Sequence, residues 1–274
     1  MIALALTLYF LLSFKLGYKY RKSLFGRRKI EDRFRQIPMH GNLAATCFVL
    51  MYAHRIVSTH CAKYIIGACL IRWILDGNVP VLRDASRPGE PDGLTLSFEN
   101  EFPFGEQLEE DVCAIVRDAC GDDSFLDYGE LDSWARKAYR KVSKLDEHAR
   151  TLAREWLTAY HLLEKGLTLT ENGQKEAVRV IGLRNYLDAV IGGQERQIDE
   201  SLMKEYLVLA GLFGSARQLA GTFERQYPES YGRLAASAGL DAGTLTAAIR
   251  YAVRISESAM DNARKERERN EKES

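Results

Sequence analysis

The chain has 274 residues, an apolar content of 46% and a formal net charge of +0. This length leaves room for two small domains, and the apolar fraction is ordinary for a globular protein. The balanced charge argues against non-specific electrostatic binding to nucleic acid, because proteins that bind phosphate backbones in this way carry a basic excess.

The first element in chain order is an apolar, nearly uncharged stretch over Met1–Leu16. Apolar residues followed by cations are typical of a chain held at a bilayer with its downstream part on the cytosolic side. A membrane span needs about 20 residues, and the long stems of Lys15 and Lys19 allow the apolar region to extend to residue 18. The sequence therefore predicts a single-pass membrane anchor at 1–18 and a soluble part that faces the cytoplasm. We expect contacts with anionic membrane lipid from seven cations: Lys15, Lys19, Arg21, Lys22, Arg27, Arg28 and Lys29.

Two other interpretations of this stretch remain open. A cleaved secretory signal is disfavoured, because no charge precedes the apolar run and no small-x-small cleavage site precedes the cations. A buried core helix fits the length but leaves the cations unexplained. Because the apolar stretch is short, the chain is also expected to begin inside a longer protein.

Residues 19–40 are predicted to form a basic juxtamembrane linker that ends in a short helix over Ile30–Ile37, closed by Pro38. Asn42 is placed to cap the next helix, over Leu43–His54, whose apolar residues have helical spacing.

A second long helix is expected over Cys61–Asp76, because apolar residues recur there every four positions and Gly77 is a typical helix stop. A hairpin follows, with strands at Val79–Leu82 and Leu94–Phe98 on either side of a turn-rich stretch. Helix, helix, hairpin is the order of a winged helix. A further helix over Glu106–Ala119 completes the winged-helix-like unit that we predict at 41–120.

The rest of the chain is predicted to be a helix-rich unit at 121–260, followed by a charged tail at 261–274. In the tail, opposite charges four residues apart (Arg264 and Glu268, Glu268 and Lys272) favour a solvated helix end. The predicted fold class is thus α+β and mainly helical, with an N-terminal transmembrane helix. The expected helices are Leu131–Val142, Leu145–Leu163, Gln174–Ile191, Ile198–Phe213, Ser215–Phe223 and one from an Asp241 cap to Ala263, and Tyr227-Pro228 is expected to be a turn.

Four stretches of the chain resemble the cytoplasmic part of a bacterial family of YciQ-like predicted membrane proteins of unknown function. The resemblance covers about residues 35–229 and consists mainly of packing motifs, so it implies a fold and supplies no catalytic residues. Typical relatives carry a β-rich extracytoplasmic domain and another membrane segment upstream, which implies that 1–18 is the last span of a longer architecture. The stretches are RQIPMHGNLAATCFVL (Arg35–Leu50), IIGACLIRWILDGNV (Ile65–Val79), Leu169–Val190 and Leu202–Glu229.

Two histidines and three cysteines in the first third of the chain are candidate zinc ligands. His54 and His60 lie near Cys47, Cys61 and Cys69, but the short spacings of structural zinc sites are missing. No metal site is therefore predicted. Reduced thiols facing the cytosol are expected for all five cysteines, which are Cys47, Cys61, Cys69, Cys113 and Cys120.

Three further motifs have simpler interpretations. Gly192-Gly193-Gln194 matches the tripeptide of peptide-release factors, but it follows a helix end, where paired glycines are common. The acidic run Gly121–Asp127 lacks the ligand register of a calcium loop and is expected to be a solvated loop or helix cap. A basic stripe is expected to be a solvated face, with anionic lipid as its favoured partner if it binds anything: Arg136, Lys137, Arg140, Lys141 and Lys144.

These observations together predict a non-enzymatic protein that serves as a protein-interaction module on the cytosolic face of a membrane. No cofactor and no small-molecule substrate is inferred. The alternative is a membrane-tethered winged-helix DNA-binding regulator that reads DNA through its second helix, although Cys61–Asp76 offers only Lys63 and Arg72 as cations. A third interpretation is an enzyme with a dispersed site, which a deep pocket with several titratable groups would favour.

Overall fold

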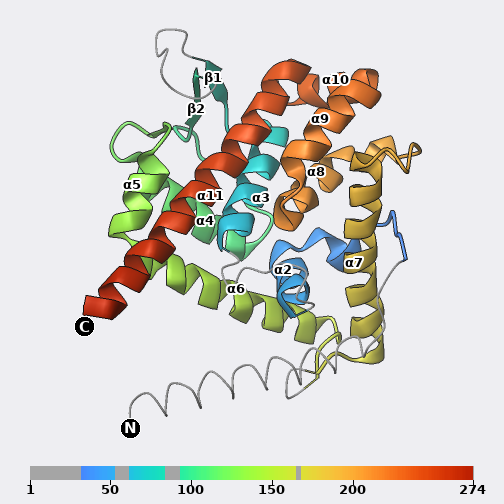
Figure 1. Cartoon of the computed structure of the whole chain (residues 1–274), viewed down its shortest axis with the longest axis horizontal. Helices are drawn as coiled ribbons and strands as arrows, with labels where there is room; N and C mark the ends of the chain where they lie inside the picture. The colour runs from blue at the N-terminus through green and yellow to red at the C-terminus, as the bar shows by residue number, and fades with distance from the viewer. Residues whose placement is uncertain (1–31, 53–61, 84–92, 165–167, 274) are drawn as a thin grey trace.

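The computed structural model describes residues 32–52, 62–83, 93–164 and 168–273. The predicted anchor at 1–18 and the seven cations from Lys15 to Lys29 lie outside these residues. Across the described ranges, no helix combines the length and the apolar character needed to cross a membrane. The fold is mainly helical α+β, with one small sheet (Figure 1).

The described chain begins with an extended segment rather than a helix. Residues 32–37 are not helical, so the helix predicted over Ile30–Ile37 is wrong in its described part. The reason is tertiary: the Phe34 N–H donates a hydrogen bond to the Gly182 carbonyl at 3.1 Å. The Phe34 ring lies where a side chain at position 182 would be, and it therefore requires glycine there.

The helices predicted over Leu43–His54 and Cys61–Asp76 are confirmed in their described parts. A 3₁₀ turn, η1 (Pro38–Gly41), precedes α2 (Leu43–Tyr52), and α3 (Ala62–Leu75) follows. The Asn42 side chain accepts a hydrogen bond from the Ala45 N–H at 2.8 Å, as expected of an N-cap.

The sheet contains the predicted hairpin and one strand that the sequence did not indicate. Strand β1 (Val81–Arg83) pairs with β2 (Leu94–Ser97), and β2 pairs with β3 (Phe125–Leu126), both antiparallel. Strand β3 lies within the acidic run that was expected to be a solvated loop or cap. Leu126 is fully buried there, and its carbonyl accepts a hydrogen bond from the Tyr251 hydroxyl at 3.1 Å. The position of β3 therefore depends on a residue 125 positions away.

Two boundaries in the second half differ from the prediction. The break between the first two helices falls at Ala138, several residues earlier than expected. Tyr227-Pro228 opens a helix instead of forming only a turn, because proline is well suited to the first position of a helix. The remaining helices are α4 (Gln107–Cys120), α5 (Glu130–Lys137), α6 (Tyr139–Ala159), α7 (Glu171–Ile191), α8 (Met203–Phe213), α9 (Ala216–Gln226), α10 (Pro228–Ser237) and α11 (Ala242–Glu273), with a 3₁₀ turn, η3, at Glu200–Leu202.

Helix α11 begins at the predicted cap and runs through the predicted charged tail. The Asp241 carboxylate accepts a hydrogen bond from the Thr244 N–H at 2.9 Å. Near the other end, Arg264 and Glu268 form the expected pair at 3.5 Å. The helix spans 32 residues and crosses the molecule diagonally over α3 (Figure 1).

The core is built around α3, which packs against both α8 and α11. Gly211 of α8 allows a close approach, because a Cβ there would lie 3.0 Å from the Ala68 backbone. The long run of α3 from Ile65 to Leu75 is almost wholly buried, with Arg72 as the partly exposed exception. Because α8 and α11 belong to the predicted second unit, the two predicted units share one hydrophobic core.

Candidate functional site

A group of charged and aromatic side chains surrounds a cavity of about 480 Å³. Its walls come from η1, the end of α3, the start of α4, the end of α6 and the start of α8, so five separate segments meet there. A volume of this size is within the range of small-molecule sites. Besides His40 and Tyr160, the ionisable residues of the described lining are Arg72, Asp76, Glu106, Glu109, Lys204 and Glu205.

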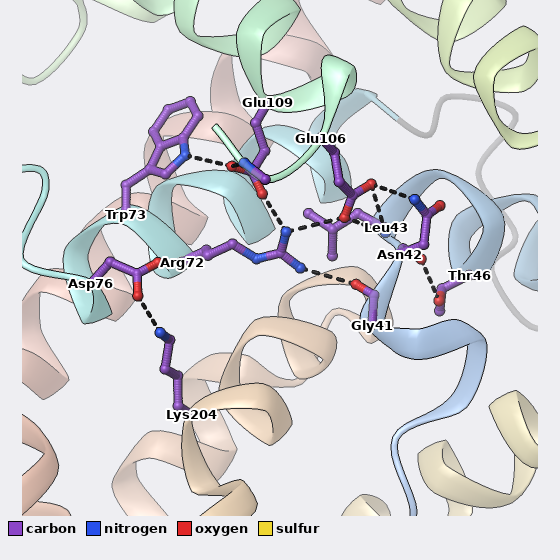
Figure 2. A network of polar contacts seen from close by, with 11 residues as sticks. Gly41, Asn42, Leu43, Thr46, Arg72, Trp73, Asp76, Glu106, Glu109 and Lys204 are labelled. Carbon is purple, nitrogen blue, oxygen red and sulfur yellow. Dashed lines mark hydrogen bonds and ion pairs between the residues drawn. The ribbon is translucent and has the colours of Figure 1, made fainter. Parts of the chain in front are cut away.

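Arg72 is the centre of a polar network on one side of this cavity (Figure 2). Its Nη1 forms ion pairs with Glu106, at 3.1 Å, and with Glu109. Its Nη2 donates a hydrogen bond to the Gly41 carbonyl at 3.0 Å. Burial alone would lower the pKa of Arg72, but the charges of Glu109 and Glu106 outweigh it and raise that pKa. The guanidinium therefore stays charged and links α3 to α4 and to the turn before α2.

Glu109 is the most deeply buried member of the network, with an exposed fraction of 2%. Besides Arg72, its carboxylate accepts hydrogen bonds from the Gly105 N–H at 3.2 Å and from the Trp73 indole N–H at 3.4 Å. A buried carboxylate is tolerated when it has a cation and further donors around it. The Glu109 side chain therefore requires Arg72.

Glu106 caps a helix to which it does not belong. Its carboxylate accepts hydrogen bonds from the Leu43 N–H, the first residue of α2, at 3.1 Å and from the Asn42 side-chain amide at 2.8 Å (Figure 2). Burial raises the pKa of Glu106, while Arg72 and the Leu43 N–H oppose that rise. Because its oxygens are occupied by donors from two segments, this carboxylate holds α2 in place and is a poor proton-transfer group.

The turn η1, which contacts Arg72 through the Gly41 carbonyl, is strained. Met39 and His40 both adopt left-handed backbone conformations, with φ of 53° and 49°. The Met39 N–H is held by the Glu176 carboxylate at 3.0 Å, and the Gly41 carbonyl that follows is held by Arg72. Such strain persists only where the surroundings enforce it, and it is concentrated at functional sites. It is therefore a second sign, besides the cavity, that this region serves a function.

Aromatic side chains lie at the rim. Trp156 and Tyr160 are stacked with ring centroids 4.2 Å apart, and the His40 ring lies 5.4 Å from that of Tyr160. Tyr160 is 52% exposed, so this rim is accessible from solvent.

Helix α8 supplies the last wall. Lys204 forms an ion pair with Asp76 at the end of α3 (Figure 2). Val208 and Leu209 add apolar surface. The neighbouring Glu205 differs from the other carboxylates of the lining, because its Oε2 is shielded from solvent and has no hydrogen-bond partner in the described part of the chain.

None of the predicted lipid contacts and none of the weighed zinc ligands is among the described residues that line the cavity. The seven predicted lipid contacts from Lys15 to Lys29, together with His54, His60 and Cys61, fall outside the described ranges. Cys47 and Cys69 are buried in the core, and burial raises the pKa of the Cys69 thiol well above its usual range. In the described ranges, no three His, Cys, Asp or Glu side chains are grouped to hold a metal ion.

The glycine pair ends a helix, and two members of the basic stripe form ion pairs on the surface. Gly192 and Gly193 end α7, and Gly193 has a positive φ of 69°. In the stripe, Lys141 pairs with Asp118 at 2.6 Å, and Arg136 pairs with Asp132 at 2.7 Å. The pair with Lys141 and a hydrogen bond from Trp134 lower the pKa of Asp118.

One signal in the sequence could have indicated the network. Glu109 lies one position after Leu108 and three before Val112, on the apolar face of α4. A carboxylate on an apolar helix face implies a buried cation partner, and the packing identifies that partner as Arg72.

Comparison with protein-family models, with curated proteins and with solved structures finds no match to this chain. The resemblance to YciQ-like proteins therefore stays a prediction, and the functional argument depends on the site itself.

Proposed function

We propose that this protein is a non-enzymatic binding module whose recognition site is the cavity between η1, α3, α4, α6 and α8. The observation that carries the proposal is the set of charged side chains already fixed around a cavity of small-molecule size. Preorganised polar groups bind a ligand without the entropic cost of ordering them at that moment.

Binding is favoured over catalysis by the state of the polar groups. Glu106 and Glu109 both engage Arg72, and Lys204 engages Asp76. No serine, threonine or cysteine is among the described residues that line the cavity. A hydroxyl nucleophile of serine or threonine and a thiol nucleophile are thus missing from the described lining. The cavity does hold several titratable groups, the feature expected to favour an enzyme, but most of its charged groups are engaged with one another.

The proposal retains the membrane attachment expected from residues 1–18, with the soluble part facing the cytoplasm. What supports it is the apolar stretch Met1–Leu16 and the cations that follow. The protein partner expected from the sequence also stays a prediction. In such a module, the presence of ligand in the cavity is the state that the partner protein would detect.

The winged-helix interpretation of 41–120 is supported only by the order of α2, α3, β1 and β2. Its DNA-binding version needs α3 to enter a groove of the duplex. Because Ile65, Leu70 and Trp73 of that helix are buried in the core, we favour the cavity over a DNA-binding role.

The binding site is tested by filling it. Asn78 lines the cavity outside the ion-pair network, so Asn78→Trp is expected to occupy part of the space. Thermal unfolding of the full chain is measured with a panel of small amines, carboxylic acids, sugars and nucleosides. A ligand at 100 times its Kd adds about 2.7 kcal/mol to the free energy of unfolding, and Asn78→Trp is expected to abolish this stabilisation.

The matched control is Gln226→Trp, at an exposed position outside the cavity. If no compound stabilises the wild type more than Asn78→Trp, the proposal is wrong.

Membrane attachment is tested by flotation of the full chain with vesicles of phosphatidylcholine, with and without phosphatidylglycerol. Changing the seven cations from Lys15 to Lys29 to Gln is expected to reduce binding to the anionic vesicles at least tenfold, since each basic residue near the surface contributes about 1 kcal/mol. The control variant changes the residues of the basic stripe to Gln, and its binding to the anionic vesicles is expected to persist. These residues are Arg136, Lys137, Arg140, Lys141 and Lys144. A wild-type chain that stays at the bottom of both gradients would contradict the anchor.

A further inference from the structure

Another hollow in the surface lies where the last part of α11 passes the start of α6 (Figure 1). It is an open groove of about 630 Å³, a volume within the range of small-molecule sites. Its charged lining in the described chain consists of Arg140 and Lys144 of α6 and of Arg267 and Glu271 of α11. The two residues from each helix are four positions apart and therefore share one helix face.

The two cations from α6 are available to a ligand. Arg140 and Lys144 are exposed, and neither forms an ion pair or a hydrogen bond with a side chain in the described ranges. The Arg140 guanidinium instead lies over the Tyr139 ring, 5.8 Å from its centroid. By contrast, Arg136 and Lys141 of the same basic stripe do not line the groove, and each is paired with an aspartate.

Arg267 brings a third cation to the groove from α11. Its Nε lies 3.5 Å from the Glu271 carboxylate, and the two side chains are 35% and 67% exposed. Exposed pairs of this kind are weak, so Arg267 can exchange Glu271 for another anion. Three cations and one carboxylate leave an excess of two positive charges along the groove. A hollow lined by one sign of charge concentrates ions of the opposite sign.

A phosphomonoester matches this charge better than other common anions do. It carries a charge of about −1.5 to −2 at pH 7, whereas a carboxylate or a phosphodiester carries a single negative charge. Arginine guanidinium groups bind phosphate oxygens through two parallel hydrogen bonds, and lysine adds a point charge. The groove offers two arginines and one lysine from two helices.

We propose that the groove between α6 and α11 binds a phosphomonoester group through Arg140, Lys144 and Arg267. The group can belong to a soluble phosphate ester or to a lipid headgroup, because both present the same chemistry. This site is separate from the cavity around Arg72, with which it shares no described lining residue.

Titration calorimetry of the full chain tests the soluble source with glucose 6-phosphate. Glucose controls for the sugar, and dimethyl phosphate controls for a single negative charge. We expect glucose 6-phosphate to bind and the two controls to give no heat. The double variant Arg140→Gln with Lys144→Gln is expected to weaken binding at least tenfold. Lys137→Gln removes an exposed cation of the same stripe that does not line the groove, and it is expected to bind as the wild type does.

The two charges from α11 are expected to change the affinity in opposite directions. Arg267→Gln removes a phosphate ligand and is expected to weaken binding several-fold. Glu271→Gln removes the opposing carboxylate and is expected to tighten binding. A loss of affinity in both variants would show that the α11 side of the groove acts only through its structure, and it would overturn the assignment.

Flotation with phosphatidylcholine vesicles tests the lipid source. One set contains phosphatidic acid, which is a phosphomonoester, and the other contains phosphatidylglycerol, which is a phosphodiester. If a lipid headgroup is the ligand, the wild type prefers phosphatidic acid, and the double variant loses this preference while it keeps its binding to phosphatidylglycerol.

Binding from either source that the double variant weakens would support the groove. The inference is overturned if the wild type neither binds glucose 6-phosphate nor prefers phosphatidic acid. It is also overturned if Lys137→Gln weakens binding as much as the double variant does, because the stripe as a whole would then attract the anion.

Discussion

Arg72→Met is expected to lower the free energy of unfolding by about 3 to 5 kcal/mol, the range observed when one partner of a buried ion pair is removed. The methionine keeps most of the length of the side chain but leaves the Glu109 carboxylate, which is 2% exposed, without its cation. It also frees the Gly41 carbonyl beside the strained residues Met39 and His40. Urea unfolding followed by circular dichroism measures the change as a lower midpoint with an unchanged slope.

A matched ion pair on the surface provides the control. Arg217 pairs with Glu257, and their side chains are 42% and 28% exposed. Arg217→Met is expected to cost less than about 1 kcal/mol, because exposed pairs contribute little. Adding Glu109→Gln to Arg72→Met is expected to recover part of the loss, since the double variant has no unpaired buried charge at that position. Equal losses for the two arginines would show that the network is not essential to the fold.

Gly173→Ala is expected to destabilise the protein by about 2 to 3 kcal/mol, although alanine is the better helix former. Gly173 lies in the first turn of α7, and its N–H is hydrogen-bonded to the Thr170 cap at 3.0 Å. A Cβ at this position would overlap the backbone carbonyl of Leu162. A backbone atom cannot move aside as a side chain can, so the start of α7 has to shift. The midpoint of urea unfolding again provides the measurement.

Gly232→Ala is the matched change, and it is expected to shift the free energy of unfolding in the opposite direction. Gly232 lies within α10, and a Cβ there meets no atom within 4 Å. Alanine is expected to raise the free energy of unfolding by about 0.5 to 1 kcal/mol, the ordinary gain of replacing glycine in a helix. If both variants lose stability by similar amounts, the contact with the Leu162 carbonyl is not the reason why Gly173→Ala is destabilising.

Elements with local signals were predictable from the sequence. Asn42 and Asp241 cap the helices expected of them, and Gly77, with a positive φ of 69°, follows the end of α3 as expected. Apolar periodicity located α3, α4 and α7 to within a few residues. These features are encoded within one or two helical turns, where residue type and spacing carry the information.

Elements that depend on distant partners were not predictable in this way. The segment around Phe34 is extended because it docks on α7, and β3 forms because β2 and Tyr251 lie beside it. The same holds for the candidate site, in which Arg72 meets Glu106 and Glu109 from 34 and 37 residues away. A single sequence shows the charged residues but not which of them the packing brings together.

The crossing of α3 by α11 has a consequence for how this protein is made. Every other described element precedes α11 in the chain and therefore leaves the ribosome before it. Until α11 is translated, the side of α3 that it covers has no partner. The Leu126 carbonyl of β3 likewise lacks the hydrogen bond that the Tyr251 hydroxyl of α11 donates to it. A nascent chain interrupted before residue 242 therefore lacks the helix that covers α3, and the apolar surface left exposed is of the kind that chaperones bind.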